Sequence, residues 1–319
     1  MSDALLDHAS QSIAVGSKSF AAAARLFAPE TRRSAVMLYA WCRHCDDVID
    51  GQAQGFLRAG GTADETTLAG LEQATRDIYA GHEPEAPAFA ALREVVQRHE
   101  IPLRYPLDHL AGFRMDVEGR RYETFSDTLE YCYHVAGVVG VMMAMVMGVR
   151  EQATLDRACD LGVAFQLTNI ARDLVEDAAN ERVYLPDEWL QQVGLARDEL
   201  ASPRHRRALA GLAARLVDEA EPYYDSALGG LPALPLRSAW SIATARAVYR
   251  EIGMKVRMRG SAAWDQRLST SGTDKLRLIA LAGGQALASR RARVSPRPAS
   301  LWNRNEATAA RHAGAATQP

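Results

Sequence analysis

Cysteine and net positive charge are both scarce in this chain. Four cysteines among 319 residues are too few and too irregularly spaced for a secreted disulfide framework, which favours a cytoplasmic protein. The formal net charge of −2 gives no general attraction to nucleic acid, so we expect no nucleic-acid partner. The N-terminus lacks the basic start and apolar run of a signal peptide. No glycine fingerprint for a nicotinamide cofactor occurs either, so we expect no NADPH-dependent step.

Long uncharged stretches are also rare, and only one reaches the length of a membrane span. Residues 131–149 contain no Asp, Glu, Lys or Arg, and these 19 residues lie near the lower limit for a transmembrane helix. The stretch includes Gly137, Gly140 and Gly148, and its flanks carry no strong positive bias. We therefore expect a central helix that is buried on all sides.

The rest of the pattern is helical almost throughout, without the alternation that predicts paired strands. A single all-α domain over residues 1–289 is expected. The arginine- and proline-rich tail, residues 290–319, is predicted to be disordered. The predicted helices cover residues 3–14, 19–27, 30–50, 65–80, 86–99, 105–118, 126–149, 151–178, 187–193, 203–228, 237–259 and 273–291.

The first of two acidic clusters ends the helix predicted over residues 30–50. Tyr39, Arg43, Asp46 and Asp50 follow one another at steps of four, three and four, so they share one helix face. Like charges at that spacing weaken a helix by a few tenths of a kcal/mol, and a bound divalent cation would offset the cost. A solvated acidic last turn is the plain alternative. A calcium EF-hand loop is excluded, because Val48 stands at a position that such a loop gives to an oxygen ligand.

The second cluster lies about 120 residues later, on an otherwise apolar helix. Gln166, Asn169, Asp173 and Asp177 again share one face, and Arg172 adds a cation suited to a phosphate oxygen. A polar stripe in such a helix is costly unless it binds something. Two such helices facing each other across a bundle predict a magnesium–diphosphate site.

At these residues the chain resembles the squalene/phytoene synthase family, over residues 8–288. The resemblance implies an all-α isoprenoid-synthase bundle around a central cavity. It also implies the head-to-head condensation of two geranylgeranyl diphosphates through prephytoene diphosphate to phytoene, the first committed step of carotenoid biosynthesis. The stretches that carry it are residues 16–20, 39–50, 131–137, 166–177, 182–186 and 235–240.

The resemblance also implies roles for particular residues. Magnesium, or manganese in its place, would be held by Asp46, Asp50, Asn169, Asp173 and Asp177. Contacts to diphosphate are implied for Gly16, Ser17, Lys18, Ser19, Tyr39, Arg43, Gln166, Arg172, Tyr249 and Arg267. The catalytic set comprises Asp46, Asp50, Asp173, Asp177, Arg43 and Tyr131, whose hydroxyl would either orient diphosphate or assist proton transfer.

Four alternatives stay open at this point. A dehydrosqualene- or squalene-type synthase that joins farnesyl diphosphates would carry the same motifs, because the metal site does not read chain length. A chain-elongating prenyltransferase, a terpene cyclase and a non-catalytic helical assembly protein of the same fold are the others. Because substrate and product are hydrophobic, we also expect loose attachment to the inner face of the cell membrane. Downstream carotenoid enzymes are the expected partners.

Overall fold

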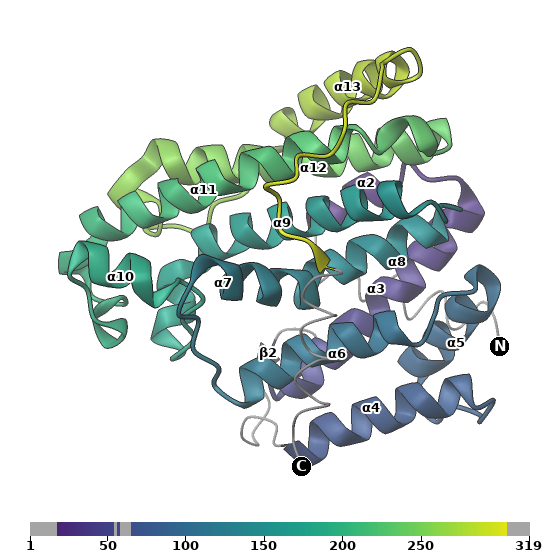
Figure 1. The fold of residues 1–319 in the computed structure, drawn as a ribbon, viewed down its shortest axis with the longest axis horizontal. Coiled ribbons are helices and arrows are strands. Elements are labelled where there is room, and N and C mark those ends of the chain that lie inside the picture. Colours follow the sequence, from purple (N-terminus) through teal and green to yellow (C-terminus); the bar gives the residue numbers. More distant parts are fainter. Residues whose placement is uncertain (1–17, 54–55, 58–64, 305–319) are drawn as a thin grey trace.

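The computed structural model describes residues 18–53, 56–57 and 65–304, and this part of the chain is an all-helical bundle (Figure 1), as predicted. Its one strand pair is short and antiparallel, between Gln52–Ala53 (β1) and Phe56–Leu57 (β2). The helices are α2 (Lys18–Ala24), α3 (Pro29–Ile49), α4 (Glu65–Tyr79), α5 (Pro87–His99), α6 (Arg104–Val117), α7 (Phe125–Cys132), α8 (Val138–Val146), α9 (Gln152–Ala179), α10 (Asp187–Val193), α11 (Arg206–Leu228), α12 (Leu236–Arg259) and α13 (Gly272–Ser289).

The uncharged stretch forms the centre of the bundle. The helix predicted over residues 126–149 is present, but a π-helical turn at Tyr133–Gly137 divides it into α7 and α8. By length and composition Phe125–Val146 is the one helix of the described residues that could cross a membrane, yet 72% of its most apolar window is buried inside the protein. The prediction of a buried central helix is therefore confirmed.

Two glycines let α8 and α9 approach until their backbones touch. A Cβ atom on Gly140 would lie 2.3 Å from the carbonyl oxygen of Ala158, and one on Gly162 would lie 2.2 Å from that of Ala136. Real Cβ atoms do not approach a carbonyl so closely, so a side chain at either position would force the helices apart. This contact fixes one wall of the cavity described below.

The other helices enclose this centre in layers. In Figure 1, α11, α12 and α13 lie on one side of α9, whereas α6, α3, α5 and α4 lie on the other side, beyond α7 and α8. The chief contacts of α9 are with α11, α8, the π-helical turn at Tyr133–Gly137 and α12. Helix α11 continues through Pro222 to Leu228. The helix predicted over residues 3–14 lies outside the described residues.

The tail expectation is wrong for residues 290–304, which we call the C-terminal strap. The strap crosses α9 (yellow in Figure 1), and Arg297 forms a bidentate pair with Asp160 at 2.7 and 2.8 Å. Arg304 pairs with Asp156 at 2.8 Å, and Leu301 is buried. Arginines that look solvated in the sequence thus meet acids on α9, and the folded domain reaches at least residue 304. Residues 305–319 of the predicted tail lie outside the described residues.

Candidate functional site

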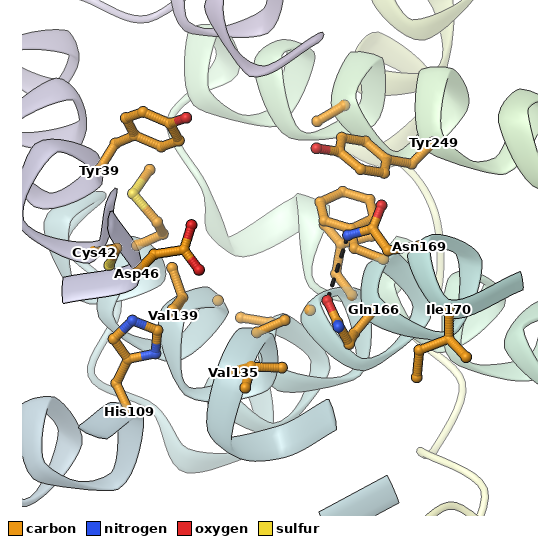
Figure 2. Close-up of a pocket in the computed structure, with 18 of the residues that line it drawn as sticks. Tyr39, Cys42, Asp46, His109, Val135, Val139, Gln166, Asn169, Ile170 and Tyr249 are labelled. Atoms are coloured by element: carbon orange, nitrogen blue, oxygen red, sulfur yellow. Dashed lines mark hydrogen bonds between the residues drawn. The ribbon is translucent and has the colours of Figure 1, made fainter. Parts of the chain in front are cut away.

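A cavity of about 1120 Å³ lies between α3, α8, α9 and α12. One end is polar and carries both acidic clusters, whereas the other end is apolar. Asp46 and Tyr39 of α3 lie on one side of the cavity, and Gln166 and Asn169 of α9 lie on the other, with Tyr249 of α12 above them (Figure 2). The hydroxyls of the two tyrosines point toward each other across the cavity. The prediction that the two clusters face each other is therefore correct in geometry.

The α3 wall carries the first cluster in the predicted stripe. Tyr39, Arg43, Asp46 and Asp50 all line the cavity, and Arg43 donates a 2.9 Å hydrogen bond to Asp46 and pairs with Asp47 at 2.6 Å. Burial, reinforced by the charge of Asp50, raises the pKa of Asp46 to about 6. Because α3 ends at Ile49, these acids lie at its C-terminus, where the helix dipole disfavours negative charge.

The α9 wall carries the second cluster. Asp173 forms an ion pair with Arg172. Burial and then the charge of Asp173 raise the pKa of Asp177 to about 7. The side-chain nitrogen of Asn169 donates to Gln166 at 3.4 Å, while its buried oxygen Oδ1 has no hydrogen-bond partner. A buried amide oxygen without a donor is costly, so this atom is suited to a ligand or an ion.

Arg182, which the sequence analysis did not assign, connects the two walls. It follows α9 and donates a 2.6 Å hydrogen bond to Asp50 of α3. Its charge also lowers the pKa values of Asp46 and Asp177, although burial dominates in both. Its position in the sequence, five residues after Asp177, is the one feature that could have indicated a role at the site.

Asp116 of α6 is a second residue that the sequence analysis missed. Its carboxyl accepts hydrogen bonds from the hydroxyls of Tyr131, at 3.2 Å, and Tyr184, at 3.1 Å, and the two rings stack at 4.5 Å between centroids. Burial raises the pKa of Asp116 to about 7. All three residues line the cavity. A single acid within an apolar helix pattern carries too little signal to be found without its tyrosine partners.

The opposite end of the cavity is mostly apolar, and the stretch from Tyr131 to Met147 supplies much of it. Thr154 and Arg157 also line the cavity here, next to Gly230. Ala136, Gly140 and Ala144 line the cavity, whereas Gly137 packs against Cys159 and Tyr133. Further apolar lining residues include Val135, Val139, Met143, Met147, Leu161, Leu231, Leu234 and Ile242. This end can hold a long hydrocarbon chain away from water.

The donor chemistry of the polar end fits a hard divalent cation. Carboxylate and amide oxygens are the ligands that such ions prefer, and the oxygen Oδ1 of Asn169 is unpaired. In residues 18–53, 56–57 and 65–304, however, no three His, Cys, Asp or Glu side chains converge as a metal site would require. The acids instead pair with Arg43, Arg172 and Arg182. Metal binding would therefore require these side chains to exchange partners.

The remaining predicted contacts lie at the rim or outside the described residues. A nitrogen of Arg267 lies 3.5 Å from an oxygen of Asp173, and another lies 3.4 Å from Glu176, at the cavity edge. Tyr249 lines the cavity and stacks on Phe165 at 4.2 Å. Lys18 and Ser19 begin α2, whereas Gly16 and Ser17 lie outside the described residues.

Comparison with known sequences gives matches along most of the chain. The squalene/phytoene synthase family matches residues 13–274. The chain is 59% identical to the 15-cis-phytoene synthase of Pantoea ananas over 302 residues, which are 94% of this chain and 98% of that protein. It is 50% identical to the 15-cis-phytoene synthase of a Paracoccus strain, over 95% of this chain and 99% of that protein.

Comparison with solved structures gives the same fold. A dehydrosqualene synthase in complex with a ligand has a TM-score of 0.81 at 28% identity, over 90% of this chain and 98% of that chain. A squalene synthase from Alicyclobacillus acidocaldarius has a TM-score of 0.71 at 22% identity, over 81% of this chain and 95% of that chain. The bundle is therefore an isoprenoid-synthase fold.

Proposed function

The chain belongs to the squalene/phytoene synthase family, and from this we infer that it is a phytoene synthase, a prenyl transferase that joins two geranylgeranyl diphosphates head to head. The observation that carries the inference is the single cavity that joins acids and arginines at one end to an apolar chamber at the other. A substrate with a diphosphate head and a long hydrocarbon chain matches both ends. The 15-cis-phytoene synthases that are 59% and 61% identical to this chain support the same substrate.

The reaction begins when one substrate loses its diphosphate. The resulting allylic cation bonds to the second substrate, and loss of a proton closes the cyclopropane ring of prephytoene diphosphate. Loss of the second diphosphate, rearrangement and loss of another proton then give phytoene. Water would quench each cation, so the apolar end of the cavity must exclude it.

The polar end neutralises the leaving diphosphate. The cations that line this end are Arg43, Arg172 and Arg267. The same space is lined by Tyr39, Gln166 and Tyr249. We assign a divalent ion, Mg²⁺ or Mn²⁺, to the two facing donor sets. Bound there, it would offset the charge that develops on the leaving group. The residues that would hold it are Asp46, Asp50, Asn169, Asp173 and Asp177.

The hydroxyl of Tyr131 is positioned by Asp116. A hydroxyl has one hydrogen to donate, and Tyr131 already donates it to this carboxyl. It is therefore poorly placed to donate to a diphosphate oxygen, and we assign it to proton transfer. Its oxygen can accept a proton while Asp116 takes the one that it gives up, and the raised pKa of Asp116 suits that exchange near neutral pH.

The test is turnover of defined diphosphates by the purified protein with Mg²⁺. We expect geranylgeranyl diphosphate to give phytoene without reduced nicotinamide, and farnesyl diphosphate to give far less product. Preferred turnover of farnesyl diphosphate would identify the dehydrosqualene- or squalene-type alternative, which the resemblance to a solved dehydrosqualene synthase keeps in view. A cyclic product, a longer diphosphate or no turnover would point to the cyclase, the elongating enzyme or the assembly protein.

The location and partners follow from the chemistry of the substrate and product. We propose that the enzyme works in the cytoplasm, in loose contact with the inner face of the cell membrane, and passes phytoene to downstream carotenoid enzymes. A twenty-carbon diphosphate and a forty-carbon hydrocarbon both partition into lipid, which supports this arrangement. Fractionation of cells that express the full chain tests it, and recovery of all activity in the membrane-free fraction would contradict it.

A further inference from the structure

The outer face of α13 is apolar and exposed. Leu276 is 71% exposed, and Leu281 and Leu287 are each 61% exposed, which places them among the most exposed large apolar side chains of the described residues. At 100° per residue, these leucines share an arc of the helix with Ala280, Gly284 and Ala288. The opposite arc, with Leu278, Ala282 and Ala286, is buried. The helix therefore has two apolar faces, of which only one packs on the bundle.

The described part of the chain leaves this outer face open. In Figure 1, α13 is the outermost helix, and its main contacts are with α12 and the short turn at Leu231–Ala233. Soluble monomers rarely expose a continuous apolar strip along a whole helix, and such strips mark surfaces that bind a partner or a membrane. No charged residue occurs between Arg277 and Arg290, so the strip is uninterrupted from Leu278 to the end of the helix.

The charges around the strip are basic. Arg277, near its start, lies 3.7 Å from Glu251 of α12, whereas Arg290, Arg291 and Arg293 follow its end. The one acid of α13, Asp274, is already paired with Lys255 at 2.6 Å. A cluster of arginines at one end of an apolar strip matches an anionic bilayer surface, where each basic residue contributes on the order of 1 kcal/mol.

The cavity lies directly behind the end of this helix. Arg290 donates hydrogen bonds of 3.1 Å to the carbonyl oxygens of Leu231 and Pro232, and the side chain of Leu231 lines the apolar end of the cavity. Leu236, which begins α12 five residues later, is 46% exposed. One turn of chain thus separates the apolar end of the cavity from the basic end of the exposed strip.

We propose that the outer face of α13, with Arg291 and Arg293, is a docking surface for an anionic lipid bilayer. The leucines insert among the acyl chains near the headgroups, and the arginines contact lipid phosphates. Docking turns the apolar end of the cavity toward the lipid, where a greasy substrate or product is concentrated. The docking itself needs no turnover, whereas this consequence rests on the proposed function.

Vesicle co-sedimentation of the full chain tests the proposal. Vesicles of phosphatidylcholine with phosphatidylglycerol should bind the protein, vesicles of phosphatidylcholine alone should bind it weakly, and salt should weaken the first interaction. The double variant Leu281→Ser/Leu287→Ser should lose roughly tenfold or more in affinity, because several apolar groups per side chain no longer enter the lipid. Arg293→Glu should lose about fivefold or more.

Two matched controls separate this surface from general effects. Val193→Ser removes an apolar side chain that is 42% exposed on α10, and Arg207→Glu reverses an exposed charge at the start of α11. Both should bind vesicles like the wild type. Equal losses in control and test variants, or unchanged binding by the double variant, would overturn the proposal. So would a dimer in the wild type that the leucine substitutions convert to a monomer, because the face would then be a self-association surface.

Turnover separates this proposal from the proposed function. With geranylgeranyl diphosphate dispersed in detergent, the double variant should match the wild type. With substrate in anionic vesicles it should be slower by about the factor lost in binding. If vesicle binding is lost but turnover in vesicles is unchanged, the docking surface stands and its link to the cavity fails. If the wild type binds vesicles but turns over no diphosphate, the proposed function fails and the docking surface stands.

Discussion

Helix α9 carries two pairs of aspartates at the same spacing, and their surroundings could hardly differ more. Asp156 and Asp160 meet Arg304 and Arg297 of the C-terminal strap, more than 130 residues away in sequence. Asp173, with Asp177 four residues later, faces the cavity, where its first partner is the neighbouring Arg172. An Asp-x-x-x-Asp pattern on a helix therefore does not by itself indicate a metal site. Whether such a pair of acids serves stability or binding depends on the residues that the fold places next to it.

The two pairs also differ in how fully their charges are met. Asp160 is 1% exposed and accepts two hydrogen bonds from Arg297 and one of 2.6 Å from Ser226. By contrast, burial and a neighbouring acid raise the pKa of Asp177 to about 7. A carboxyl with saturated partners stabilises the fold, whereas one with a raised pKa is ready for a cation. The comparison predicts opposite consequences for mutation at the two ends of α9.

The largest expected effect is on activity at the cavity end. Asp173→Asn keeps the shape of the side chain but removes its charge, so we expect turnover to fall roughly a thousandfold. The midpoint of urea unfolding should change little, because relief of the repulsion with Asp177 offsets the weakened pairing with Arg172. Asp225→Asn, on the exposed surface of α11, is the matched control and should keep full activity. If Asp173→Asn unfolds the protein, the acids at both ends of α9 stabilise the fold, and the contrast between them is wrong.

The strap end should show the reverse. Asp160→Ala leaves Arg297 and Ser226 without their shared acceptor, and breaking a buried ion pair in this way costs about 3 kcal/mol. Urea unfolding followed by circular dichroism measures this loss in the free energy of unfolding. The activity per folded molecule should stay near that of the wild type. A stable but inactive Asp160→Ala protein would mean that the strap contributes to catalysis.

A third prediction compares one arginine at the cavity with one arginine of the C-terminal strap. Arg182→Gln removes the cation that connects Asp50 to the α9 wall, and we expect roughly a hundredfold loss of turnover with little change in stability. Arg297→Gln should instead cost about 2 kcal/mol of stability with little change in turnover. Measuring turnover and unfolding for both variants under the same conditions gives the comparison. Equal losses of turnover and of stability in the two variants would contradict the contrast between the two ends of α9.

The sequence predicts much of this arrangement and misses parts of it for physical reasons. Helix periodicity placed Asp46 and Asp50 on one face of α3 and Asn169, Asp173 and Asp177 on one face of α9, because residues four apart on a helix are neighbours. The uncharged stretch correctly predicted a buried helix. These are local patterns, and a local pattern is enough when the element is a long helix.

The misses are contacts between residues far apart in sequence. The strap looked disordered because its composition is basic and proline-rich, and nothing local shows that Arg297 meets Asp160, 137 residues earlier. Asp116 was overlooked because its partners, Tyr131 and Tyr184, come from two other segments. The π-helical turn at Tyr133–Gly137 was also missed, since its periodicity differs little from that of the flanking helices.

The smallest expected effect concerns Asp116, which belongs to neither aspartate pair of α9. It tests whether a second cavity acid with a raised pKa makes the free energy of unfolding depend on pH. Its pKa, raised from 3.8 to about 7, means that the folded protein holds a proton there that the unfolded chain releases above pH 4. Its contribution to stability is therefore present at low pH and is lost as pH rises toward 7. Asp116→Asn removes this dependence. Relative to the wild type, the variant should gain on the order of 2 kcal/mol between pH 5 and pH 7. Urea midpoints across that range measure the gain, and a constant difference would show that Asp116 is ionised in the folded protein.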